Sequence, residues 1–281
     1  MRVPLPNFKL RGFLVAALVL LLVSSVGIIL SERLVSTLNR IVVERREATR
    51  PASLTVTVIE PENCQRCAAT QPLVDLIRAQ PVSVAGVTTL TATDPQASDL
   101  LTTYRLDRTP ALIVGGEINK DQKLQQLWQS YGQYADDAVV IYPVGVYVET
   151  AGQKVRGEVS VTLLTDRRCE TCYDVGINQP ILRRFGVPLD QSSVLDVGSD
   201  EGQKLVRDFR ILSVPTFVIR GDTEIYQALK AVWPQVGTTE PDGTMVFRNG
   251  VTQMGTYRDL VKGQVITAST TPASAPPAAA R

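Results

Sequence analysis

The pattern of hydrophobic and polar positions begins with one long apolar run. Residues 13–30 read FLVAALVLLLVSSVGIIL, 18 residues without a charged side chain. As a helix this run spans roughly 27 Å, close to the thickness of the hydrocarbon core of a bilayer. A cleaved signal peptide has a shorter apolar core and a small-x-small cleavage site, which the following Ser-Glu-Arg does not provide. We therefore predict a transmembrane helix over 13–30, after an N-terminal tail over 1–12.

Beyond this run, apolar residues recur at helical spacing with charged residues between them. This stripe comprises Leu34, Leu38, Ile41 and Val42. The pattern stops at Arg50-Pro51, because a residue that precedes proline disfavours the helical conformation. We predict a helical stalk or linker over 31–51. Its stripe is a candidate for self-association, or it packs near the lipid headgroups or on the domain that follows.

The rest of the chain contains two copies of one pattern. Shifting the chain by 105 residues aligns the copies without gaps. The matched positions include Leu54–Ile59 with Val159–Leu164, Cys64 with Cys169, Cys67 with Cys172, Pro110 with Pro215, Gly116 with Gly221, Leu124 with Leu229, and Trp128 with Trp233. Chance would not preserve cysteines, proline and tryptophan in one register, so we predict a duplicated domain over 52–150 and 155–263. Residues 264–281 are rich in Thr, Ala, Ser and Pro and are predicted to form a disordered tail.

Each copy predicts the same alternation of strands and helices. In the first copy the predicted strands cover 54–59, 87–92, 111–114 and 139–142, with helices over 65–79 and 96–104 and a further helix that carries Trp128. In the second copy the strands cover 159–164, 194–197, 216–219 and 244–248, with helices over 170–185 and 201–209 and one that carries Trp233. This alternation is typical of a layered α/β fold, and about 100 residues are enough for each copy to bury its own core.

Composition narrows the chemistry. The 281 residues carry a formal net charge of +1 and include no histidine. A nearly neutral chain gives no reason to propose a nucleic-acid partner. Without histidine, Ser-His-Asp and Cys-His catalysis and histidine-based metal sites are excluded. The groups that remain available for chemistry are thiols, carboxylates, lysines and the backbone.

All four cysteines occur in two C-x-x-C motifs, each placed between a predicted strand and a predicted helix. The first cysteine of a motif is then expected at a helix N-terminus, where free N–H groups and the helix dipole stabilise a thiolate. The second cysteine, one turn later, attacks the mixed disulfide and releases the partner. We therefore expect Cys64 and Cys169 to be nucleophiles, and Cys67 and Cys172 to be resolving thiols.

Two other uses of the cysteines compete with exchange chemistry. A four-cysteine zinc site is disfavoured, because 101 residues separate Cys67 from Cys169, whereas zinc ribbons place about 15–20 between their pairs. Structural disulfides in a non-catalytic binding module are the other alternative, although a C-x-x-C bridge closes a very short loop and stabilises little. The sequence favours exchange at one or both motifs, with no metal and no bound cofactor.

Prolines complete the pattern: Thr109-Pro110 and Val214-Pro215 each place a proline 46 residues after the first cysteine of their unit. With C-Q-R-C and C-E-T-C, these residues make both units resemble the thioredoxin superfamily. The resemblance implies that Pro110 and Pro215 are cis and that Thr109 and Val214 line a substrate groove. It also implies two tandem thioredoxin-like folds, each a mixed sheet with flanking helices, after the transmembrane helix.

The sequence also departs from that superfamily. Val58 and Leu163 stand six positions before the first cysteines, where reducing members usually carry an acidic residue. Pro72 matches a kink proline of the first helix, but the second unit has Pro180 three positions later in register. The direction of exchange is therefore left open.

The residue inside the first motif suggests a difference between the two sites. Arg66 lies between Cys64 and Cys67 and should favour a Cys64 thiolate. A lower thiol pKa goes with a more oxidising disulfide. We predict that the Cys64–Cys67 pair is the more oxidising of the two.

These features together predict a single-pass membrane protein that exchanges disulfides with protein thiols. The bulk of the chain is expected on the extracytoplasmic side of the cell membrane, because disulfides are most useful in an oxidising compartment; basic residues on both sides of 13–30 do not decide the orientation. The architecture also resembles the electron-relay partners of vitamin K epoxide reductase-type membrane proteins, which implies a membrane redox partner of that type. The alternative is a non-catalytic, membrane-anchored scaffold or chaperone with the same folds.

Overall fold

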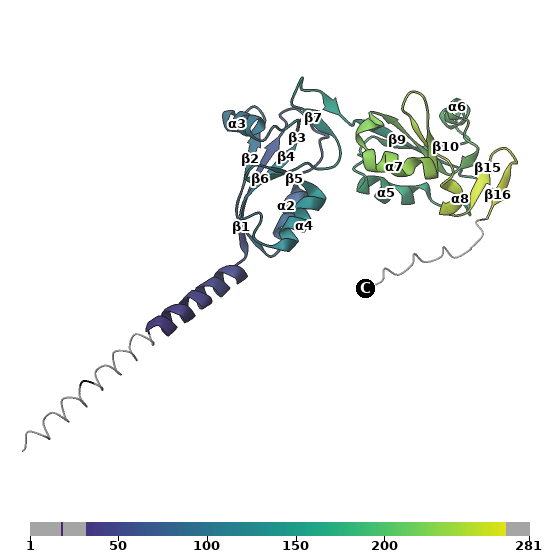
Figure 1. Cartoon of the computed structure of the whole chain (residues 1–281). Coiled ribbons are helices and arrows are strands. Elements are labelled where there is room, and N and C mark those ends of the chain that lie inside the picture. Colours follow the sequence, from purple (N-terminus) through teal and green to yellow (C-terminus); the bar gives the residue numbers. More distant parts are fainter. Residues whose placement is uncertain (1–17, 19–31, 268–281) are drawn as a thin grey trace, which may run out of the picture. The chain divides into compact units, whose positions relative to one another are not determined.

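The computed structural model describes Leu18 and residues 32–267, and the chain divides into two compact units, Met1–Pro51 and Ala52–Arg281. In the first unit, residues 32–49 are helical with exposed side chains, and the helix ends just before Arg50-Pro51 (Figure 1). The predicted transmembrane helix over 13–30 lies, except for Leu18, outside the described residues. Among the residues that are described, no helix is both long enough and apolar enough to cross a membrane.

The first half of the second unit is built on a mixed five-stranded sheet. Its strands, in spatial order, are β2 (Val82–Thr91), β1 (Ala52–Glu60), β4 (Ala111–Gly116), β6 (Ala138–Ile141) and β5 (Gly132–Ala135). β1 pairs in parallel with β2 and antiparallel with β4. Alternate β1 residues are buried because successive side chains of a strand point to opposite faces of the sheet.

Helices cover both faces of this sheet (Figure 1). They are α2 (Gln71–Arg78), α3 (Pro95–Thr103) and α4 (Gln122–Tyr131). α2 and α4 pack on the face that carries Leu54 and Val56, whereas α3 packs on the opposite face against Ile59. Trp128 of α4 is fully buried, so the tryptophan-bearing helix contributes to the core.

The second half repeats this architecture, as the internal repeat predicts. Its strands, in spatial order, are β10 (Ser192–Asp196), β9 (Val159–Thr165), β12 (Thr216–Gly221), β14 (Met245–Phe247) and β13 (Gly237–Thr239). Its helices are α5 (Gln179–Arg184), α6 (Asp200–Phe209), α7 (Gln227–Val236) and the short α8 (Val251–Met254), with 3-10 turns η1 (Val175–Asn178) and η2 (Thr223–Ile225). β9 is again parallel to one neighbour and antiparallel to the other.

Each half also contains a small three-stranded sheet that the sequence pattern did not predict. In the first half it consists of β3 (Arg108–Thr109), β7 (Tyr147–Glu149) and β8 (Val155–Arg156). In the second half it consists of β11 (Ser213–Val214), β15 (Tyr257–Asp259) and β16 (Gln264–Ile266). The expectation that disorder begins at residue 264 was therefore wrong, because 264–266 pair with β15.

One glycine in each half ends the antiparallel strand beside the first strand. Gly116 has a φ of +95° and Gly221 a φ of +117°, a region that residues with a Cβ rarely adopt. A Cβ on Gly116 would lie 2.5 Å from the carbonyl oxygen of Ser53, and one on Gly221 would collide with Glu158 in the same way. The matched glycines thus permit the turn that brings these strands together.

Candidate functional site

Each C-x-x-C motif forms its own disulfide directly after the first strand of its half. Cys64 is bonded to Cys67 and Cys169 to Cys172, with a Cα–Cα distance of 5.4 Å in both pairs. All four cysteines of the sequence lie among the described residues, and all four are bonded in this way. The structure therefore brings the predicted nucleophile and resolving cysteine of each half together.

The helices after the motifs begin later than predicted. α2 begins at Gln71 and α5 at Gln179, rather than at 65 and 170. Pro72 and Pro180 lie in the first turns of these helices, where a missing N–H and a fixed φ suit proline. Pro72 therefore starts its helix instead of kinking it, whereas Pro180 lies where the 3-10 turn η1 runs directly into α5. The cysteines lie in the irregular segments before these helices, so the prediction that the first cysteine of each motif stands at a helix N-terminus was wrong.

Both predicted prolines follow cis peptide bonds, at Thr109-Pro110 and Val214-Pro215. This confirms the conformation that the resemblance implied. Thr109 ends β3 and pairs with Val148 of β7, and Val214 ends β11 and pairs with Arg258 of β15. Both residues are buried, Thr109 at 2% and Val214 at 0% exposed, and Pro110 and Pro215 are buried as well, so the predicted groove residues are covered in the described chain.

A backbone hydrogen bond joins each motif to the segment that leads into β7 or β15. The N–H of Ala68 donates to the carbonyl oxygen of Val146 at 2.8 Å, and the N–H of Tyr173 donates to that of Thr256 at 2.8 Å. Because β7 and β15 pair with the residues before the prolines, this contact holds each disulfide turn near its cis-proline.

Arg66 of the first motif forms an ion pair with carboxylates of the second half. Its Nε donates to Asp190 Oδ2 at 2.6 Å, a second nitrogen donates to Asp190 Oδ1 at 3.2 Å, and Glu158 lies 3.5 Å away. The hydrogen bond from Arg66 holds the pKa of Asp190 below its usual range, against the effect of burial. The positive charge that was expected to favour the Cys64 thiolate is thus compensated, and the redox order of the two pairs stays a prediction.

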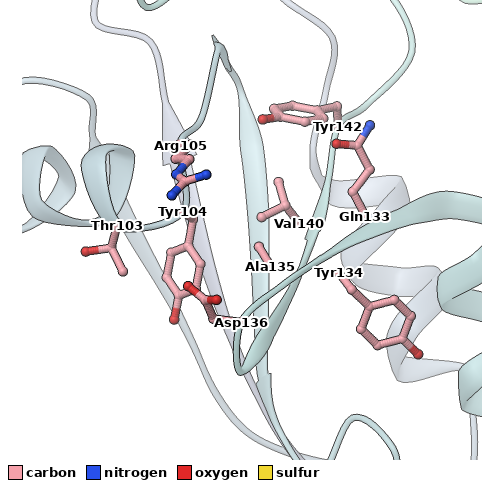
Figure 2. A pocket seen from close by; sticks show the side chains of 9 residues that line it. All are labelled: Thr103, Tyr104, Arg105, Gln133, Tyr134, Ala135, Asp136, Val140 and Tyr142. Atoms are coloured by element: carbon pink, nitrogen blue, oxygen red, sulfur yellow. The ribbon is translucent and has the colours of Figure 1, made fainter.

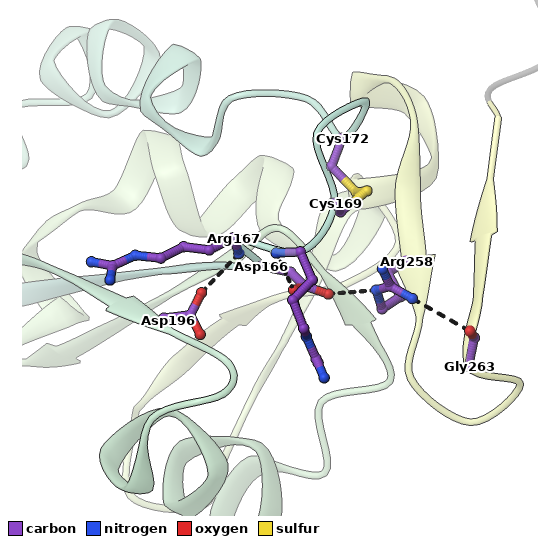
Figure 3. Close-up of a disulfide and its surroundings, with 8 residues drawn as sticks. Asp166, Arg167, Cys169, Cys172, Asp196, Arg258 and Gly263 are labelled. Carbon is purple, nitrogen blue, oxygen red and sulfur yellow. Dashed lines mark hydrogen bonds and ion pairs between the residues drawn. A yellow bond between two sulfur atoms is a disulfide. The ribbon is translucent and has the colours of Figure 1, made fainter.

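The second disulfide has a more enclosed setting than the first. Cys169 is only 8% exposed, whereas Cys64, Cys67 and Cys172 are half-buried. Asp166, three residues before Cys169, has a side chain with no exposed area and interacts with Arg168 and Arg258 (Figure 3). Burial alone would raise the pKa of Asp166, but hydrogen bonds from Arg168 and Arg258 outweigh it and hold the pKa below its usual range.

Asp166 and Arg258 were not predicted as site residues from the sequence. A signal for Asp166 was present, because the aligned residue of the first copy is Pro61. A charged residue at one copy's motif and not at the other's marks a difference between otherwise matched sites. No comparable signal marked Arg258, since its partner is 92 residues away in the sequence.

Two cavities of the described chain lie away from the cysteines. One of about 360 Å³ in the first half is polar and is lined by Thr103, Tyr104, Arg105, Gln133, Tyr134, Ala135, Asp136, Val140 and Tyr142 (Figure 2). At its rim the hydroxyl of Tyr104 donates to Asp137 Oδ1 at 3.0 Å. The other, of about 250 Å³, lies between α5, α7 and the second sheet and is mostly apolar. Neither of the two includes a cysteine or a cis-proline.

Comparisons with known proteins find few matches. No family model and no curated protein matches the chain. Among solved structures, the chain is similar to the alkylhydroperoxide reductase component AhpF of Enterococcus faecalis (12% identity, 66% of this chain and 96% of that chain, TM-score 0.18). It is also similar to a protein disulfide oxidoreductase of Aeropyrum pernix (11% identity, 66% and 89%, TM-score 0.19).

The two halves share the same topology around their C-x-x-C motifs. Each half has a first strand in the interior of its sheet, a C-x-x-C disulfide soon after that strand, and a cis-proline before the antiparallel strand. Helices flank both sheets. Each half therefore has a thioredoxin-like fold, with one C-x-x-C disulfide in each of the two repeated folds.

Proposed function

We propose that the protein is a membrane-anchored, extracytoplasmic thiol-disulfide oxidoreductase that acts on protein thiols and disulfides. The observation that carries the proposal is the disulfide turn that a backbone hydrogen bond holds beside a cis-proline in each half. Cys64 and Cys169 act as the nucleophiles of the reduced forms, and Cys67 and Cys172 as the resolving thiols.

In the oxidising direction, a substrate thiolate attacks one sulfur of the C-x-x-C disulfide. A mixed disulfide forms, and the other cysteine leaves as a thiolate. A second substrate thiolate then attacks the substrate sulfur of the mixed disulfide, which yields a substrate disulfide and two motif thiols. Two electrons and two protons pass from the substrate to the motif. Reduction of a substrate disulfide is the same sequence in reverse.

The edges of the small sheets support a substrate groove at the predicted residues. β3 and β11 are the outer strands in the orders β3-β7-β8 and β11-β15-β16. An outer strand offers backbone N–H and C=O groups to an extended peptide, which adds to the sheet as a further strand. We propose that substrate chains pair with β3 and β11 in this way and so lie next to Thr109-Pro110 and Val214-Pro215, which are themselves buried, and next to the neighbouring disulfide.

Trapping with a defined probe tests this proposal. Cys67→Ser and Cys172→Ser should each form a mixed disulfide with an oxidised dithiol peptide, at Cys64 and Cys169 respectively, detected as a dithiothreitol-sensitive mass increase. Variants with both cysteines of one motif replaced by serine are the matched controls, because they keep the fold and lack the nucleophile of that motif. If neither single variant captures the peptide, exchange is not the function.

The membrane placement is part of the same proposal. It rests on the uncharged run over 13–30 and on the usefulness of disulfide exchange in an oxidising compartment. A membrane redox partner of the vitamin K epoxide reductase type would then exchange electrons with one motif. Alkylation of reduced whole cells by a membrane-impermeant maleimide should label the four cysteines, and labelling only after lysis would place them on the cytoplasmic side.

A specific observation favours the alternative of a membrane-anchored scaffold or chaperone. Neither motif lies at a helix N-terminus, and Cys169 is buried, so two common causes of high thiol reactivity are missing. In that case the native protein and the double-serine variants bind a partner equally well, with no covalent intermediate.

A further inference from the structure

The two disulfide turns differ in the charges that surround them. At the second site Asp166 and Arg258 form an ion pair, and the Asp166 side chain is completely buried. At the first site the residue aligned with Asp166 is Pro61. Arg258 pairs with Val214, the residue before the second cis-proline. The corresponding partner of Thr109 in the first half is Val148, which has no charge. The ion pair is therefore specific to the second site.

Asp166 uses both carboxylate oxygens. Oδ1 accepts from the backbone N–H of Arg168 at 3.0 Å and from the guanidinium of Arg168 at 3.3 Å, and Oδ2 accepts from Nε of Arg258. Arg258 also donates to the carbonyl oxygen of Gly263 at 3.4 Å. A buried charge is costly unless it is paired and hydrogen-bonded, so Arg168 and Arg258 together stabilise the buried carboxylate.

The pair joins the disulfide turn to the strand beside the cis-proline. The N–H of Cys169 donates to the backbone carbonyl oxygen of Asp166 at 3.0 Å, so Asp166 begins the turn that carries this cysteine. Arg258 lies opposite Val214, the residue before Pro215. Figure 3 shows the Asp166–Arg258 contact beside the Cys169–Cys172 disulfide.

We propose that Asp166 and Arg258 are positioning residues of the second site, and that their opposite charges set the equilibrium between the disulfide and dithiol forms of Cys169–Cys172. The inference concerns the site used in the proposed function, but it requires no protein partner. A failure of the trapping experiment would therefore not contradict this inference. Likewise, a failure of this inference would not contradict the proposed exchange function.

The two charges act on the reduced form in opposite directions. A thiolate at Cys169 is disfavoured by the negative charge of Asp166 and favoured by the positive charge of Arg258. Within the pair these effects largely cancel. Arg167, Arg168 and Glu170 are also near the turn, but they are exposed, and solvent and salt screen exposed charges. The Asp166–Arg258 pair, in which Asp166 is fully buried and Arg258 is 20% exposed, is thus the arrangement that a single substitution would unbalance most.

Equilibration with glutathione measures this balance. The disulfide and two glutathione thiols yield two protein thiols and glutathione disulfide. In Asp166→Asn the charge of Arg258 is uncompensated, so we expect the equilibrium constant for reduction to rise roughly tenfold, about 30 mV more oxidising. In Arg258→Gln the carboxylate keeps only the exposed Arg168 as a charged partner, so the constant should fall, by less than tenfold. The double variant should return close to the native value.

Matched controls separate charge from structure. Each pair is measured with the other pair replaced by serine, and the Cys64–Cys67 constant should not change in any of these variants. Arg258→Lys keeps the charge and should stay near the native value. Arg248→Gln removes a comparable ion pair to Glu240, 3.0 Å long, and should leave the Cys169–Cys172 constant unchanged.

A purely structural role would not shift the equilibrium constant in opposite directions in Asp166→Asn and Arg258→Gln. If Asp166→Asn and Arg258→Gln shift the constant in the same direction, or if neither shifts it, the inference is overturned. If Asp166→Asn does not fold, Arg258→Gln and Arg258→Lys decide the question, because equal constants in these two variants would overturn it as well.

Discussion

The hydroxyl of Tyr173 donates a hydrogen bond to the carbonyl oxygen of Pro215 at 2.7 Å. It thereby joins the residue after the second C-x-x-C motif to the cis-proline of the same half. The aligned residue of the first half is Ala68, which has no hydroxyl to donate. The two sites share the backbone contact that holds the turn, but only the second adds this side-chain contact.

Tyr173→Phe should therefore destabilise the second half. It removes one hydrogen bond and leaves the Pro215 carbonyl without this donor, which costs about 1 kcal/mol of unfolding free energy. Urea denaturation measures the loss. Tyr134→Phe is the control, because Tyr134 is 48% exposed and its replacement should change nothing. Equal stability of Tyr173→Phe and the native protein would contradict the prediction.

The two disulfides should also differ in accessibility. Cys169 is 8% exposed and Cys64 is half-buried, and the rate of thiol-disulfide exchange depends on access to the sulfur. In proteins that retain one pair each, a phosphine reductant should cleave Cys64–Cys67 faster than Cys169–Cys172, as measured by quenched alkylation and mass spectrometry. In urea, where access is equal, the difference should disappear. A difference that persists in urea would have another cause.

Asp190 controls how much of the Arg66 charge reaches the first disulfide. Asp190→Asn removes the carboxylate that binds Arg66 at 2.6 Å, so the pKa of the Cys64 thiol should fall and the Cys64–Cys67 pair should become more oxidising. Thiolate absorbance as a function of pH measures the pKa. Glu158→Gln, at 3.5 Å, should have a smaller effect. The reverse order of these two variants would refute this assignment.

Acid should weaken the second half through Asp166. Burial opposes ionisation, yet the hydrogen bonds from Arg168 and Arg258 keep the pKa of Asp166 below its usual range. A carboxylate with a lowered folded pKa contributes stability above the unfolded pKa, near 3.9, and loses it as pH falls through the folded pKa. The unfolding free energy should fall below about pH 4, and less steeply in Asp166→Asn. Asp99→Asn, an exposed carboxylate on α3, should follow the native curve.

Gly221 should not tolerate a side chain. Alanine there combines a φ of +117° with a collision between its Cβ and the Glu158 carbonyl oxygen, so Gly221→Ala should lose roughly 1–3 kcal/mol. Gly116→Ala should behave alike in the first half. Gly86→Ala is the control, because no atom lies within 4 Å of its Cβ position. Thermal unfolding would reveal the difference, and a native Tm for Gly221→Ala would contradict it.

Several parts of the fold follow from local pattern. The first strands, the duplication and the buried tryptophans were predictable, because the alternation of a strand and a repeated spacing can be recognised from the order of residues alone. The helix starts after the motifs were not. Pro72 and Pro180 fit a kink or a first turn equally well in sequence, and the structure places them in the first turn.

The sequence by itself determined that two similar folds each carry a C-x-x-C motif after the first strand and a proline 46 residues after its first cysteine. Only the tertiary structure decided the electrostatic setting of each disulfide. Arg66 meets Asp190 across 124 positions, and Asp166 meets Arg258 across 92. Such contacts depend on where separate loops and strands come together in the fold, which cannot be predicted from a local periodicity of the sequence. The two motifs therefore look alike as sequence, whereas the folded chain makes them chemically different.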